Sequence, residues 1–186
     1  MLNGIFFVCL SLSLWTSGSS LSCKWMQHKF QQFSKNSLVL IDSMGNNSTN
    51  TTNTTNTTVD ARVGFPNHLY NQASKASAED KLSFTVQILE EMVVLFEEDN
   101  SKASWEEIRE ENFLQVVTQV ADGLRSCIGS HSYKRKNKKI QMYFKRLSSH
   151  VLEQMDNSAQ AWELIRKEMK THLVRADLLC SSLLTN

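Results

Sequence analysis

Residues 162–183 read WELIRKEMKTHLVRADLLCSSL and carry the strongest fold signal in this 186-residue chain. Apolar side chains recur there at steps of three or four, at Trp162, Ile165, Met169, Leu173, Ala176, Cys180 and Leu183. This period places the apolar groups on one face of an α-helix. The segment therefore predicts a long amphipathic helix that packs against other helices.

Four further segments have the same helical period. The first is predicted as a helix over residues 24–44, with Gly45 as a left-handed stop. The other three carry their apolar groups at Leu82, Val86, Leu89, Val93 and Phe96, at Phe113, Val117, Val120, Leu124 and Cys127, and at Ile140, Phe144, Leu147, Val151 and Met155. No segment alternates as a half-buried strand does, so the sequence predicts an all-α fold.

Helix starts and loops give a topology. Cap residues are expected at Ser77 (with Asp80), Ser104 (with Glu107), and Asn157 or Ser158. Residues 45–76 are predicted to form one long loop without regular structure, whereas the joins at 99–104 and 156–158 are short. A long first crossover lets the first two helices run parallel, which predicts an up-up-down-down four-helix bundle with an additional helix.

The N-terminus predicts export from the cell. Residues 1–22 contain no charged side chain, and their apolar block, 5–14, is too short for a bilayer, which needs roughly 20 residues. Ser20 and Ser22 are small residues suited to cleavage before Cys23. We expect a signal peptide over 1–22 and a secreted, extracellular helical domain over 23–186. The alternative is a buried N-terminal helix.

Residues 46–60 read NNSTNTTNTTNTTVD and contain five overlapping glycosylation sequons. A stretch this polar cannot form a core. In a secreted chain it predicts glycans on the long crossover loop, at Asn46, Asn47, Asn50, Asn53 and Asn56. An unmodified tract is the alternative.

Three cysteines follow the predicted signal peptide, and they allow three pairings with one thiol left over. A Cys23–Cys127 disulfide is favoured, because it would tie down the mature N-terminus. Cys180 lies in an apolar stripe and is expected to be a free, buried residue.

The sequence contains none of the familiar catalytic motifs. Its five histidines form no HExxH pair or metal-ligand spacing, and it has neither a phosphate-binding glycine loop nor a GxSxG motif. We therefore expect a protein that is not an enzyme and needs no cofactor or metal. Neither nucleic-acid binding nor membrane insertion is expected.

A basic run predicts a polyanion partner. Within 134–139 it comprises Lys134, Arg135, Lys136, Lys138 and Lys139. Such a run is typical of surfaces that bind heparan-like polyanions or an acidic receptor face. A solvated loop is the alternative.

Residues 142–173, MYFKRLSSHVLEQMDNSAQAWELIRKEMKTHL, resemble the signature of the type I interferons. The matching residues are Tyr143, Phe144, Arg146, Leu147, Ala161, Trp162, Glu163, Leu164, Ile165, Arg166 and Glu168. The segment after Cys23 is similar to the fish branch of the family. Gln160 stands where mammalian members have a cysteine, and the first loop has none, so the chain resembles the two-cysteine group of fish.

The resemblance implies a secreted antiviral cytokine with an up-up-down-down helical bundle. Such a ligand, expected to be monomeric, would bridge two class II cytokine receptor chains and trigger JAK-STAT signalling. In the family the last helix contacts one receptor chain, which implies receptor contacts at Arg166, Lys167 and Lys170. Trp162, Tyr143 and Phe144 are expected in the core. Another class II helical cytokine and a helical carrier of apolar ligands are the alternatives.

Overall fold

The computed structural model describes residues 23–45, 63–98, 100–129 and 136–184, and every regular element in these ranges is helical. The α-helices are α2 (Gln31–Gly45), α3 (Asn67–Ser74), α4 (Ala78–Phe96), α5 (Glu107–Arg125), α6 (Lys138–Leu147) and α7 (Ala159–Ser181). A π-helical turn, η1 (Met26–Phe30), precedes α2, while η3 (Ser148–Leu152) and η4 (Glu153–Met155) extend α6. None of the described helices is both long and apolar enough to cross a membrane.

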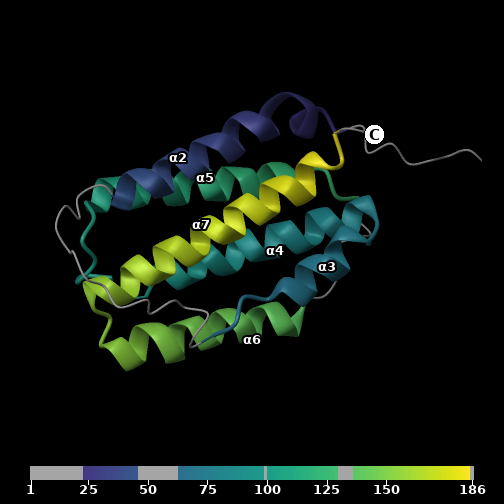
Figure 1. Ribbon diagram of the computed structural model, residues 1–186. Helices are drawn as coiled ribbons and strands as arrows, with labels where there is room; N and C mark the ends of the chain where they lie inside the picture. Colours follow the sequence, from purple (N-terminus) through teal and green to yellow (C-terminus); the bar gives the residue numbers. More distant parts are fainter. Residues whose placement is uncertain (1–22, 46–62, 99, 130–135, 185–186) are drawn as a thin grey trace, which may run out of the picture.

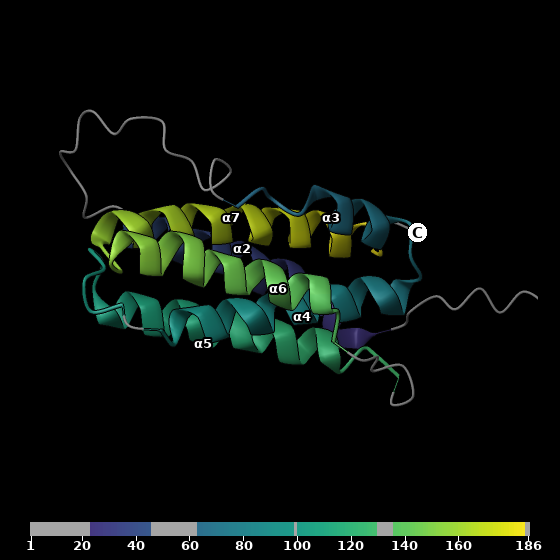
Figure 2. The ribbon, with the colours of Figure 1, turned by 90° about the horizontal axis from the view of Figure 1, so that it is seen from below.

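The four long helices form the predicted up-up-down-down bundle. Helices α2 and α4 run in one direction, and α5 and α7 run in the other (Figure 1). Helix α2 packs against α5 and α7, and α4 packs against α5, α6 and α7. Helix α6 lies on the outside, between α7 and α4 in the view of Figure 2. The fold-class prediction is confirmed.

Aromatic side chains fill the centre of the bundle. Trp162 is fully buried, and its ring lies 5.7 Å from that of Phe96 and 6.0 Å from that of Trp105, measured between centroids. Tyr143 and Phe144 on α6 are also buried, as expected. Burial of each large side chain contributes roughly 1.5–3 kcal/mol, so these residues of the family signature act first as core.

The predicted loop over 45–76 is wrong in part, because it contains the helix α3. Pro66 precedes this helix, and Leu69, Tyr70 and Ala73 form its buried face. An eight-residue helix with polar residues at most other positions is not stable alone. Packing against α4 and α7 stabilises it, and a local pattern does not encode that packing.

Two helix ends also differ from the prediction. Gly45 does not adopt a left-handed conformation, since no described glycine has a positive φ. Helix α5 begins after Glu106, which makes no side-chain cap, so the cap expected at Ser104 is wrong. The side chains of Ser77 and Ser158 do accept backbone hydrogen bonds at the starts of α4 and α7.

Candidate functional site

The carbonyl end of α2 lies beside the first half of α7 (Figure 1). The three predicted receptor contacts, Arg166, Lys167 and Lys170, are all on this part of α7. Their partners are Glu163 on the same helix and Asp42 on α2. We call this group of five residues the α2/α7 face.

Arg166 is largely buried and joins the two helices. Its Nε and Nη2 atoms each donate a hydrogen bond of 2.7 Å to the carboxylate of Glu163. Its Nη1 donates a 2.9 Å bond to the carbonyl oxygen of Ile41 on α2. The bond with Glu163 raises the pKa of the guanidinium. All three guanidinium nitrogens of Arg166 therefore form hydrogen bonds within the molecule. The sequence pattern did not indicate this internal role.

A second arginine holds the same helix end. Arg109, near the start of α5, donates from Nη1 to the carbonyl oxygen of Ser43 at 2.9 Å. The last carbonyls of a helix lack partners within it and carry the negative end of its dipole. Two guanidinium groups from different helices thus fix the point at which the chain leaves α2.

Gly45 gives Arg166 room. A Cβ atom placed on Gly45 would lie 2.6 Å from the Cζ and Nη2 atoms of Arg166, closer than such atoms can approach. A side chain at this position would therefore force the guanidinium of Arg166 to shift from its place between Glu163 and Ile41.

The two lysines lie at the surface of the α2/α7 face. The side chain of Lys167 is 65% exposed, with its Nζ 3.6 Å from Glu163. That of Lys170 is 43% exposed, with its Nζ 2.7 Å from Asp42. Farther along α7, Val174 and Leu178 are exposed large apolar residues. Neither residue was predicted as part of this surface, although their spacing of seven and eleven residues from Lys167 places them on the same side of the helix.

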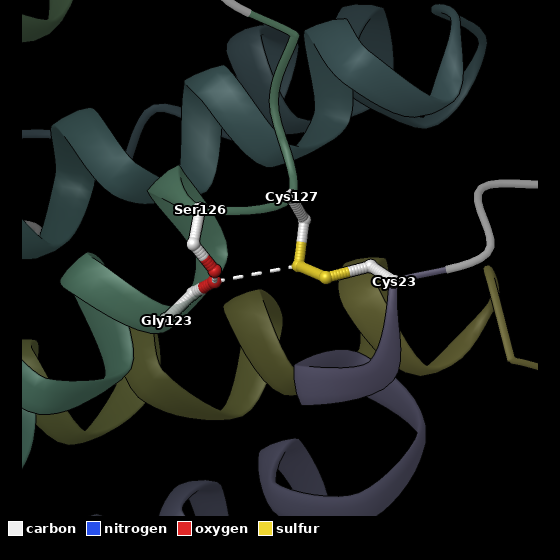
Figure 3. The surroundings of a disulfide bond; sticks show 4 residues. All are labelled: Cys23, Gly123, Ser126 and Cys127. Atoms are coloured by element: carbon white, nitrogen blue, oxygen red, sulfur yellow. Dashed lines mark hydrogen bonds between the residues drawn. A yellow bond between two sulfur atoms is a disulfide. The ribbon is translucent and has the colours of Figure 1, made fainter.

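A disulfide joins Cys23 to Cys127, as expected, and so ties the start of the first helix to the end of α5 (Figure 3). The Sγ of Cys127 lies 3.3 Å from the carbonyl oxygen of Gly123. The indole ring of Trp25 occupies the space that a Cβ on Gly123 would need, so this end is tightly packed. Cys180 is free and buried, and burial raises the pKa of its thiol to about 12.

A buried series of hydrogen bonds links α3, α6 and α7 through His172. Tyr143 donates to Glu168, so its oxygen accepts from Nε2 of His172 at 3.2 Å. This leaves Nδ1 of His172 to accept from the hydroxyl of Tyr70 at 2.7 Å. Burial lowers the pKa of His172 to about 3, so the ring is neutral. These hydrogen bonds attach α3 to the bundle.

Several predicted sites lie outside the described residues. These are the signal peptide 1–22, the five sequon asparagines, and Lys134 and Arg135 of the basic run. Lys136 is described and lies 3.2 Å from Glu90. Within the described ranges no three His, Cys, Asp or Glu side chains form a group that could hold a metal ion.

Helices α2 and α4 run parallel to each other and antiparallel to α5 and α7, α6 lies on the outside, and a disulfide closes one end. This is the helical bundle typical of cytokines. The model of the interferon alpha/beta domain matches residues 26–183, and the chain belongs to this family. It is 34% identical over 161 residues to interferon a3 of Oncorhynchus mykiss, covering 87% of this chain and 86% of that protein. The solved structure of zebrafish interferon 1 has the same fold, with a TM-score of 0.70, 24% identity, and coverage of 87% of this chain and 99% of that one. These relatives place the chain with the type I interferons of fish.

Proposed function

We propose that this protein is a secreted antiviral cytokine that brings two class II cytokine receptor chains together. Binding of both chains would activate their kinases and, through JAK-STAT signalling, antiviral genes. The observation that carries this proposal is the interferon match across 26–183, which includes the whole helical bundle. A ligand that brings two receptor chains together through two of its faces needs no catalytic group.

The α2/α7 face is proposed to bind one of the receptor chains. The side chains of Lys167 and Lys170 are exposed, and Val174 and Leu178 extend the surface with apolar area. Interfaces combine such an apolar patch with a polar rim. Arg166 enters the proposal as a positioning residue, because its guanidinium fixes Glu163 and the end of α2.

Secretion and glycosylation form part of the same proposal. A signal peptide over 1–22 would deliver the chain to the compartment in which glycans are added and disulfides form. The sequons begin at Asn46, directly after the end of α2. A heparan-like polyanion, predicted from residues 134–139, is the second proposed partner.

A carrier of apolar ligands has less support. The described interior of the bundle is filled by large side chains such as Trp162, Phe96 and Phe113. We therefore expect apolar dyes and fatty acids to bind weakly.

The direct test uses medium from cells that secrete the full chain. Fish cells treated with this medium are challenged with virus, with antibody-depleted medium as the control. Protection that disappears on depletion supports the cytokine. Well-folded secreted protein that protects no responsive cell would refute it.

A second experiment tests the face. Lys167→Ala/Lys170→Ala is compared with Lys24→Ala/Lys29→Ala, which removes two exposed lysines from the first helix. We expect the first pair alone to weaken capture by a receptor ectodomain, with an unchanged melting temperature. Equal capture by both variants would remove the lysines from the receptor site.

A further inference from the structure

The solvent face of α6 is strongly cationic. Between Arg125 and Glu153 the sequence has no acidic residue and seven lysines and arginines. Four of these are described on α6 itself, as exposed residues: Lys138, Lys139, Lys145 and Arg146. We call these four residues the α6 cationic face.

The α6 cationic face has no anionic partner in the described part of the molecule. None of its four side chains forms an ion pair with a described residue, whereas Arg166, Lys167 and Lys170 on α7 all do. Lys138 and Lys139 also lie in the first turn of α6, where the helix dipole repels cations. Lys145 and Arg146 lie in the last turn, where the dipole favours cations, so helix stability does not account for the two lysines at the start of α6.

A hollow lies between this face and the segment that leads into α3. Its volume is about 270 Å³, and its lining includes Pro66, His68, Lys138, Lys139, Met142 and Arg146. Lys138 and Arg146 both line the hollow and are eight residues apart, which corresponds to about 12 Å along the helix. The hollow therefore has cations at both ends of a rigid element, as a chain of repeated anionic groups would require.

We propose that the α6 cationic face binds a sulfated polysaccharide, with one anionic sugar in the hollow beside His68. This deepens the polyanion partner in the proposed function and rests on the secretion proposed there. It also relocates that partner, from the run 134–139 to a helix face that extends to Arg146. Sulfate groups remain ionised at neutral pH and accept the bidentate hydrogen bonds that arginine donates.

Two other polyanions fit this surface less well. A helix that binds a membrane surface buries an apolar face in the lipid. The apolar face of α6, formed by Ile140, Tyr143, Phe144 and Leu147, is already buried in the bundle. Single-stranded nucleic acid is recognised by stacking on exposed aromatic rings, and both aromatic rings of α6 are among those buried residues.

The test measures binding of the mature secreted protein to immobilised heparin, at about 0.15 M salt, where distant charges are screened. The variant changes all four residues to glutamine: Lys138→Gln, Lys139→Gln, Lys145→Gln and Arg146→Gln. A matched control removes four exposed lysines elsewhere: Lys24→Gln, Lys29→Gln, Lys35→Gln and Lys75→Gln. A milder variant, Lys145→Gln/Arg146→Gln, leaves the start of α6 intact, and circular dichroism checks that each protein is folded.

We expect the α6 variant to lose about tenfold or more in heparin affinity, with a shallower salt dependence because fewer counterions are released. The milder variant should lose part of this affinity, and the control should stay close to the unchanged protein. Desulfated heparin should bind weakly to all of them.

Four results would overturn the proposal. An equal loss in the control would mean that net charge, rather than the α6 cationic face, sets the affinity. Equal binding to desulfated heparin, or stronger binding to phosphatidylserine vesicles, would assign the surface to another partner. If the α6 variant kept its heparin affinity but was no longer captured by the receptor ectodomain, α6 would be a receptor-binding face. Heparin binding needs no receptor, so a failure of the cytokine proposal leaves this test readable.

Discussion

Replacing Arg166 by alanine separates the two roles open to this residue. The resemblance to interferons predicts a receptor contact, and hence weaker receptor binding at unchanged stability. The structure gives Arg166 three internal hydrogen bonds and a side chain that is only 10% exposed. We therefore expect Arg166→Ala to destabilise the fold.

The size of this effect follows from the groups left behind. Hydrogen bonds that involve a charged group contribute about 1.5–3 kcal/mol net, and the guanidinium is the donor in all three bonds of Arg166. The carboxylate of Glu163 would lose its main partner while its side chain is 25% exposed, which allows some recovery by water. A fully buried pair loses about 3–5 kcal/mol when one partner is removed. We expect a loss of about 2–4 kcal/mol, which lowers the melting temperature by roughly 4–16 °C in a chain of this length.

Thermal unfolding by circular dichroism measures the loss, with Lys167→Ala as the matched control on the same helix. Lys167 is an exposed partner of the same carboxylate, so its removal should lower stability by about 0.5 kcal/mol or less. Arg166→Lys should recover little, because an ammonium group cannot form the bidentate pair. A melting temperature for Arg166→Ala within about 1 °C of the unchanged protein would refute this reasoning. Receptor binding lost in that case would restore the surface role.

Three further predictions concern other parts of the molecule. Replacing Cys23 and Cys127 by serine opens a loop with a sequence separation of 104. This should cost about 4–5 kcal/mol and lower the melting temperature by roughly 8–20 °C. An unchanged melting temperature would show that the bridge adds no stability. His172 has a pKa of about 3 in the folded protein and near 6.5 in the unfolded chain. The free energy of unfolding should therefore have its full value above about pH 6.5 and should fall by up to about 1.4 kcal/mol per pH unit as the pH drops towards 3. Urea unfolding at a series of pH values should show a smaller loss of stability between pH 6.5 and pH 3 for His172→Gln than for the unchanged protein. An equal loss in both proteins would contradict this role of His172. Gly45→Ala should lower stability when Arg166 is present but not in the Arg166→Ala variant, with a coupling of about 0.5 kcal/mol or more in a double-mutant cycle. Additive effects would mean that a side chain at position 45 does not disturb Arg166.

The long helices were predictable because each carries its own signal. In α7 the apolar residues follow a helical period for more than 20 positions, and any packing that buries this stripe requires a helix there. Ser77 and Ser158 were found as caps for a related reason, since a cap acts on a backbone amide three residues away. The length of the first crossover then predicted the direction of each long helix.

Helix α3 and the role of Arg166 could not be predicted in this way. Tyr70 is held on the bundle by His172, which lies 102 residues further along the chain. Arg166 meets the carbonyl of Ile41 across 125 residues. In the sequence Arg166 is one cation in a run with Lys167 and Lys170, and nothing local separates the buried member from its exposed neighbours.

The sequence by itself determined the helical class, the bundle topology and the family, because local periods, loop lengths and a contiguous signature carry this information. It favoured the Cys23–Cys127 pairing among three, and the structure confirmed that pairing. Only the tertiary structure decided which cation of α7 is buried and that its guanidinium packs against Gly45. It also decided that the cations of α6 face solvent without described partners. These features depend on side chains that meet across the bundle, and the free energy of such contacts is set by the packed geometry of two or more helices.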